Sequence, residues 1–286
     1  MTTFTTLVSA ADLLARLQEA TPPLVLDAGF DLADPAAGER AHAAAHLPGS
    51  LYVHLDRDLS GPKTGANGRH PLPGRRAFAA TAGRLGIAPA TQVIALDRQG
   101  GVYAARLWWM LRWLGHEAVA VLDGGLRAWQ AAGGPTSSAV AAPLPAPPYP
   151  ELPPLVDLVD LDQVARRQPE VAVLDARAGE RFRGEVEPLD RVAGHIPGAL
   201  NRPFAGNLEP DGRFKPAAAL AAEFRAVLGQ RSAAEVIHSC GSGVTACHNL
   251  LALEHAGIQG VKVFPGSWSE WSSDPKRPVA TEPEDP

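Results

Sequence analysis

Residues 235–257, EVIHSCGSGVTACHNLLALEHAG, join a short apolar run, a loop with two glycines and a segment of helical periodicity. The run at 235–239 predicts a buried strand, and the apolar spacing from residue 244 onward predicts a helix. Cys240 directly follows the predicted strand and begins the loop CGSGVT. Such a unit is typical of a parallel sheet, in which ligands bind at the carboxyl ends of the strands.

The first half of the chain repeats this arrangement. Residues 93–115, VIALDRQGGVYAARLWWMLRWLG, have the same order of strand, loop and helix, with Asp97 at the position of Cys240. Three further pairs follow in the same order: VLDAG at 25–29 with VLDAR at 173–177, HLPGSL at 46–51 with HIPGAL at 195–200, and LDGGLRAW at 122–129 with FPGSWSEW at 264–271. Four ordered matches indicate a duplicated domain.

Each half alternates predicted strands and helices, so we expect an α/β fold of two tandem domains. Each domain should be a mostly parallel sheet with helices on both faces. Seven of the 18 residues at 137–154 are proline, which predicts a semi-rigid connection. We expect an N-terminal domain at 1–142, a linker at 143–154 and a C-terminal domain at 155–286.

The composition argues against several classes of partner. Of the 286 residues, 45% are apolar and 20% are charged, values typical of globular proteins. The net charge of −5 gives no electrostatic reason to expect nucleic acid or an anionic membrane as a partner. No apolar run approaches the roughly 18 residues of a membrane span, and the N-terminal residues lack the pattern of a secretory or transit signal. We therefore expect a cytoplasmic protein.

Cys240 and Cys247 are the two cysteines of the chain, which is too few for a disulfide framework. A single bridge between them stays open as an alternative. So does a zinc site formed with His238 and His248, although the spacing lacks the paired CxxC pattern of structural zinc sites. We expect neither, and no metal or organic cofactor.

The loop after Cys240 predicts a site for a nucleophilic sulfur. Gly241 and Gly243 permit a tight curl with positive φ. Backbone N–H groups from this loop to Val244 and Thr245 can then form an anion-binding nest beside a helix N-terminus. A nest of this kind stabilises a thiolate and would hold the outer sulfur of a persulfide.

Other interpretations of these positions must be weighed. A buried structural cysteine is common, and we prefer that interpretation for Cys247 because its neighbours are apolar. A phosphatase would need an arginine six residues after the nucleophile, where this chain has Ala246. Asp97 cannot carry sulfane sulfur, so the first half should be silent as a sulfur carrier.

Three elements resemble those of the rhodanese family. They are GHIPGA at 194–199, the loop at 240–245 and GSWSEW at 266–271, which GGLRAW at 124–129 matches in the first half. The resemblance covers nearly the whole chain and is similar to the tandem-domain thiosulfate and 3-mercaptopyruvate sulfurtransferases, in which only the second domain carries the cysteine. It implies two rhodanese-like domains and a sulfurtransferase that works through a Cys240 persulfide.

The loop CGSGVT resembles that of the 3-mercaptopyruvate enzymes, whereas loops such as CRKGVT place two cations beside the sulfur and suit thiosulfate. The resemblance therefore implies 3-mercaptopyruvate as donor, pyruvate as product, and cyanide, a small thiol or thioredoxin as acceptor. A thiosulfate:cyanide sulfurtransferase, a persulfide carrier or redox module acting on a protein partner, and a non-catalytic binding protein stay open. Ser242 could relay a proton or only bond its own loop.

The resemblance also implies residues that hold the donor's carboxylate. Arg181, in GERFRGE, matches the family arginine that does so, and a planar guanidinium binds a carboxylate through two bonds. A second arginine normally lies about ten residues further on. Arg191 is one place late for that role, with Arg183 as an alternative, and each of these arginines could instead be a solvated surface residue.

A proton relay is the last feature that the resemblance implies. Asp56 in VHLDRDL and His70 in RHPLP match an aspartate and a histidine that the family directs toward the loop serine. Together with Ser242 they would assist proton movement. An isolated loop histidine is otherwise an ordinary surface residue.

Overall fold

The computed structural model describes residues 3–281. The chain divides into two compact units. Unit 1 comprises residues 3–60, 73–155 and 210–214, and unit 2 comprises residues 61–72, 156–209 and 215–281. Each unit is built on one five-stranded sheet, and the expected fold class is confirmed.

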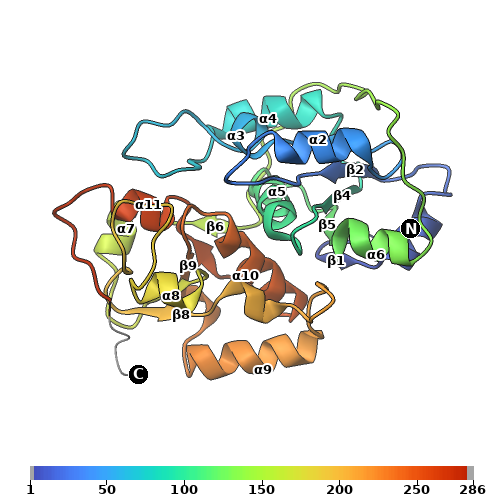
Figure 1. Ribbon diagram of the computed structural model, residues 1–286. Helices are drawn as coiled ribbons and strands as arrows, with labels where there is room; N and C mark the ends of the chain where they lie inside the picture. The colour runs from blue at the N-terminus through green and yellow to red at the C-terminus, as the bar shows by residue number, and fades with distance from the viewer. Residues whose placement is uncertain (1–2, 282–286) are drawn as a thin grey trace. The chain divides into compact units, whose positions relative to one another are not determined.

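The sheet of unit 1 is parallel and has the order β1-β5-β4-β2-β3, of which β1, β5, β4 and β2 are labelled in Figure 1. Its strands span Leu7–Val8 (β1), Leu24–Asp27 (β2), Leu51–Tyr52 (β3), Val93–Leu96 (β4) and Val119–Leu122 (β5). On one face, the helices α1 (Ala10–Arg16) and α6 (Gly125–Ala131) share a core with Ile94 and Leu96 of β4. Because side chains alternate along a strand, the intervening residues of β4 face the apolar helix α5 (Val102–Trp113), which contacts β4 and β5. The remaining helices are α2 (Ala37–Ala44), α3 (Leu55–Asp58) and α4 (Arg75–Arg84).

The sheet of unit 2 has the corresponding order, β6-β10-β9-β7-β8, and is also parallel. Its strands span Asp157–Leu158 (β6), Ala172–Asp175 (β7), Ala199–Asn201 (β8), Val236–Ser239 (β9) and Lys262–Val263 (β10). One face carries α7 (Leu161–Ala165), α8 (Gly179–Phe182) and α11 (Ser267–Trp271), whose apolar residues share one core. The helix α10 (Thr245–His255) packs against β9 and against α9 (Ala217–Leu228), and two short 3₁₀ helices, η1 (Phe204–Asn207) and η2 (Ala233–Glu235), complete the unit.

The middle strand of each sheet leads into one of the two matching loops. β4 ends before Asp97 in unit 1, and β9 ends before Cys240 in unit 2. Both loops therefore lie at the carboxyl edge of a parallel sheet, the edge where ligands bind in folds of this class. Within residues 3–281, no helix has the length and apolar content that a membrane crossing requires.

Each half of the chain contributes one short segment to the unit formed mainly by the other half. Residues 61–72, from the first half of the chain, belong to unit 2, and residues 210–214 belong to unit 1. The proline-rich segment at 143–154 lies along unit 1, where the Ala146 N–H donates to the Gly83 carbonyl at 2.8 Å and the Tyr149 N–H donates to the Ala79 carbonyl at 2.9 Å. The domain limits inferred from the repeat, 1–142 and 155–286 with a linker at 143–154, describe the duplicated halves of the sequence and stay a prediction.

Candidate active site

The loop that begins at Cys240 curls around its own sulfur atom. We call residues 240–244 the sulfur loop. The Gly243 N–H donates to the Cys240 Sγ at 3.1 Å. Gly243 has φ +75°, and a Cβ at this position would lie 2.2 Å from the carbonyl oxygen of Pro265, so only glycine fits. A backbone donor is therefore fixed on the sulfur by the fold.

The start of α11 holds the sulfur loop in place. The Cys240 N–H donates to the Ser267 Oγ at 3.1 Å, and this oxygen lies 3.9 Å from the Cys240 Sγ. Ser267 has φ +54°, a strained value for a serine. The N–H groups of Trp268 and Ser269 donate to the carbonyls of Cys240 and Gly241 at 3.0 and 2.9 Å. Ser267 lies in the repeated GSWSEW element, but the sequence pattern alone does not assign it this role.

A histidine from the first half of the chain reaches the sulfur loop inside unit 2. His70 lies in the segment 61–72, and its Nδ1 forms a hydrogen bond of 2.8 Å with the Ser242 Oγ. Both side chains are buried. The Gly61 N–H closes the segment by donating to the Pro71 carbonyl at 2.8 Å. The structure thus brings together two of the three residues expected to form the proton relay.

A network of alternating charges surrounds Arg181 of α8. The Arg181 Nη2 lies 2.6 Å from the Glu187 Oε1 and 3.4 Å from the Asp190 Oδ2. Glu187 also forms an ion pair of 3.4 Å with the buried Arg177. Arg177 forms a second ion pair, of 2.7 Å, with Asp175. Burial raises the pKa of Glu187 and lowers that of Arg177, and either shift would favour the uncharged form. The hydrogen bonds and ion pairs outweigh burial, so the pKa of Glu187 is lowered, that of Arg177 is raised, and both groups stay charged.

Arg177 is a second residue that sequence reasoning missed. Burial lowers its pKa, whereas the negative charges of Asp175, Glu187 and Cys240 raise it, and the net shift is upward. This guanidinium is therefore a permanent positive charge in the field of the Cys240 sulfur. The signal was present in the repeat, since VLDAR in the second half corresponds to VLDAG in the first.

Two guanidinium groups converge on the glycine next to the nucleophile. A Cβ added at Gly241 would lie 2.8 Å from the Arg69 Nη2 and 3.6 and 3.7 Å from the Nη1 and Nη2 of Arg181. Arg69 also forms an ion pair with Asp190. The ion pairs of this network join three guanidinium groups (Arg69, Arg177, Arg181) to three carboxylates (Asp175, Glu187, Asp190), so their charges balance.

Comparison with known proteins decides the family. The model of the rhodanese-like domain matches residues 9–132 and 160–274. The chain belongs to the rhodanese-like family. It is 47% identical over 279 residues to the probable 3-mercaptopyruvate sulfurtransferase of Pseudomonas aeruginosa, covering 96% of this chain and 98% of that protein.

Other similar proteins agree with this assignment. The putative thiosulfate sulfurtransferase of Mycobacterium tuberculosis is 41% identical, with 96% of each chain covered. The solved 3-mercaptopyruvate sulfurtransferase of Leishmania major superimposes with a TM-score of 0.83 at 29% identity, covering 94% of this chain and 74% of that chain. The prediction of a rhodanese-type sulfurtransferase is confirmed.

Not all of the remaining candidate residues lie at the sulfur loop. Val244 precedes α10 and Thr245 begins it, at the end of the sulfur loop. Arg191 is exposed and lines a cavity of about 280 Å³ in unit 2, together with Asp190 and Arg69. Asp56 lies in α3 of unit 1, so its part in a relay with the histidine of unit 2 stays a prediction.

Cys247 and His238 of β9 are both buried side chains. The Cys247 Sγ donates to the Gly243 carbonyl at 3.3 Å from inside α10, and both cysteines are free thiols. Burial lowers the pKa of His238 to about 3, so this imidazole is neutral at physiological pH. Among residues 3–281, no three histidine, cysteine, aspartate or glutamate side chains are grouped so that they could hold a metal ion.

The corresponding loop of unit 1 is filled by its own side chain. The Asp97 Oδ1 accepts the N–H groups of Gln99 and Gly101, each at 2.8 Å, and the Oδ2 accepts those of Tyr103 and Ala104 at 2.8 and 3.0 Å. Burial raises the pKa of Asp97, and these four backbone donors act against that shift. The carboxylate therefore takes the place that an anionic sulfur would occupy in an active loop.

This geometry predicts a structural role for Asp97. Asp97→Ala should lower the free energy of unfolding by about 2 kcal/mol, because buried N–H groups lose their acceptor. Urea denaturation of both proteins measures the difference. Asp97→Asn keeps one acceptor oxygen and should lose less. Equal stability of all three proteins would mean that the loop does not depend on this carboxylate.

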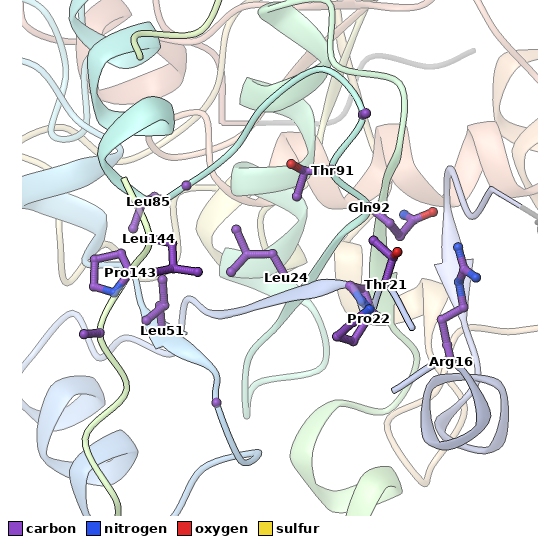
Figure 2. Close-up of a pocket in the computed structure, with 15 residues that line it drawn as sticks. Arg16, Thr21, Pro22, Leu24, Leu51, Leu85, Thr91, Gln92, Pro143 and Leu144 are labelled. Carbon is purple, nitrogen blue, oxygen red and sulfur yellow. The ribbon is translucent and has the colours of Figure 1, made fainter. Parts of the chain in front are cut away.

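A cavity of about 560 Å³ in unit 1 is a poor candidate for the chemistry. Figure 2 shows it beside Leu24 at the start of β2 and Gln92 just before β4, with Pro143 and Leu144 of the proline-rich segment at its rim. These are the amino ends of the strands, whereas ligands in parallel sheets bind at the carboxyl ends. We therefore assign it no part in sulfur transfer.

Proposed function

We propose that this protein transfers sulfur from 3-mercaptopyruvate through a persulfide on Cys240 and releases pyruvate. The observation that carries the proposal is the hydrogen bond between His70 and Ser242 of the sulfur loop. This pair offers a proton where a thiosulfate-type loop would offer cations. The name of the Pseudomonas relative supports the same donor.

The first half-reaction begins at the Cys240 thiolate, which attacks the sulfur of 3-mercaptopyruvate. A sulfur–sulfur bond forms, the carbon–sulfur bond breaks, and its electron pair remains on carbon as the enolate of pyruvate. Ser242, coupled to His70, supplies the proton that converts the enolate to pyruvate. Backbone N–H donors such as that of Gly243 stabilise the charge on the sulfur atoms.

The second half-reaction returns the enzyme to its starting state. A thiolate or cyanide attacks the outer sulfur of the persulfide, forms a new bond to it and displaces the Cys240 thiolate. The products are an acceptor persulfide or thiocyanate. We propose cyanide, a small thiol or thioredoxin as acceptors, and the cytoplasm as the compartment, on the grounds given by the sequence.

The charge balance of the site suits a donor with a single carboxylate. Arg177 is buried and paired with Asp175 and Glu187, whereas Arg181 is 17% exposed and reaches within 3.7 Å of the Cβ position of Gly241. Its planar guanidinium can bind the carboxylate of the donor. The donor's sulfur would then be directed toward Cys240.

The central experiment is mass spectrometry of the protein after treatment with 3-mercaptopyruvate and removal of excess donor. One added sulfur, located on the peptide that contains Cys240, is the expected result. The pyruvate released should equal the sulfur bound. Absence of the added sulfur, or sulfur on Cys247, would refute the proposed function.

Arg181→Ala tests the carboxylate contact. We expect kcat/KM for 3-mercaptopyruvate to fall roughly 30-fold, or about 2 kcal/mol, because a charge-assisted contact is lost. Arg181→Lys should recover only part of the loss, since lysine lacks the planar fork. Arg166→Ala, which removes an arginine that is 75% exposed on the same unit, is the control. An unchanged kcat/KM in Arg181→Ala would remove this residue from the site.

A thiosulfate:cyanide sulfurtransferase is the second candidate. The name of the Mycobacterium tuberculosis relative favours it, as do the two guanidinium groups near Gly241, which could neutralise a dianion. The ratio of kcat/KM for the two donors, measured with cyanide as the common acceptor, separates the candidates. We expect the ratio to favour 3-mercaptopyruvate.

A further inference from the structure

The segment 61–72 contributes a cation to unit 2 in addition to its histidine. The Arg69 N–H donates to the Ser269 Oγ at 3.0 Å, which fixes the backbone of this residue against α11. Gly68, with φ +84°, allows the close approach, since a Cβ there would lie 3.0 Å from the Gly266 carbonyl oxygen. The Arg69 side chain is only 25% exposed, and its guanidinium is directed at the sulfur loop.

The ends of Arg69 and Arg181 meet at the same point of the sulfur loop. Both guanidinium groups lie within 3.7 Å of the position that a side chain at Gly241 would occupy. Arg69 and Arg181 also share one acceptor, the Asp190 carboxylate, which is 5% exposed. The two cations are therefore already arranged to bind one carboxylate between them.

We infer that Arg69 is the second guanidinium that holds the carboxylate of the donor, opposite Arg181, and that Asp190 keeps both groups oriented when no donor is bound. Arg191, the residue expected from the sequence, is exposed and has no atom among the three nearest to the Gly241 Cβ position. The inference rests on the proposed function. It adds a residue from the first half of the chain that favours donors with a carboxylate.

The absence of a side chain at Gly241 is part of the same arrangement. A Cβ there would lie 2.8 Å from the Arg69 Nη2, the mobile end of a flexible side chain. Gly241→Ala should therefore displace Arg69 without removing its charge. This variant and Arg69→Ala should weaken donor binding in the same way.

Steady-state kinetics with 3-mercaptopyruvate and a fixed thiol acceptor test the inference. Arg69→Ala should raise KM about 10- to 30-fold and change kcat less than about threefold, because a carboxylate anchor contributes equally to the ground state and the transition state. Arg69→Lys should recover part of the loss, and Gly241→Ala should also raise KM. Arg166→Ala should behave like the wild-type protein. Thermal unfolding checks that each variant is folded.

A binding measurement separates this inference from the proposed function. Calorimetry with pyruvate, which has the carboxylate but no sulfur, requires no turnover. The dissociation constant for pyruvate should rise in Arg69→Ala by the same factor as KM. Unchanged KM and pyruvate binding, or a loss seen in Arg191→Ala instead, would overturn the role of Arg69. A wild-type protein that binds pyruvate through Arg69 but takes no sulfur from 3-mercaptopyruvate would refute the proposed donor alone.

Discussion

Replacing Cys240 with serine should reduce sulfur transfer to the background rate. A hydroxyl is barely ionised at neutral pH and cannot form a persulfide. Serine fits the site, since its oxygen can accept the same Gly243 N–H, so the loss should reflect chemistry rather than folding. Pyruvate release from 3-mercaptopyruvate and the mass of the treated protein measure the effect.

Cys247→Ser is the matched control for this experiment. A serine hydroxyl can donate to the Gly243 carbonyl as the Cys247 thiol does, so most of the activity should remain. An inactive Cys247→Ser protein beside an active Cys240→Ser protein would reverse the assignment of the nucleophile. Thermal unfolding of both variants would show whether either loss arises from instability.

The fold could be predicted because local patterns and the repeat agree. The apolar strands, the glycine-containing loops and the helices recur in both halves, and the carboxyl edge of the sheet follows from the parallel order. The position of Cys240 also followed from local sequence, since the strand before it and the helix after it determine where the loop lies. Ser242 and Gly243 belong to the same short stretch.

The charged residues around the sulfur loop do not follow from such local patterns: the family resemblance implied Arg181, but sequence reasoning singled out neither Arg69 nor Arg177. Arg69 and His70 lie on a segment of unit 2 that has no regular secondary structure. Because such a segment has no periodic sequence pattern, the sequence does not indicate which unit it packs in. Spacing suggested Arg191 as the partner of Arg181. In the structure Asp190 contacts both Arg181 and Arg69, and long-range packing determines that arrangement.

Asp97 illustrates the same limit. The sequence indicates that an aspartate cannot carry sulfur, but it does not show what the aspartate does instead. In the structure its two oxygens accept four backbone N–H groups of its own loop. Asp97 therefore lacks a nucleophilic sulfur and at the same time supplies the acceptor for its own loop, a role that only the folded loop shows.

His70→Ala should lower kcat for 3-mercaptopyruvate by roughly 100-fold, the usual effect of losing a group that assists proton transfer. The pyruvate enolate needs a proton, and His70 is hydrogen-bonded to the Ser242 hydroxyl that would deliver it. When thiosulfate is the donor, the leaving group is sulfite, which needs no such proton. The loss of kcat with that donor should therefore be smaller. Steady-state kinetics with both donors measure the difference.

The double variant of His70→Ala and Ser242→Ala decides whether the two residues act as one unit. Members of a single relay lose their effect together, so the double variant should be little worse than the more damaged single variant. Asp56→Ala should have a smaller effect in the same direction if Asp56 orients the imidazole. Fully additive losses, or equal losses with the two donors, would mean that the histidine only anchors residues 61–72 against the sulfur loop. In that case the enolate would have to take its proton from water.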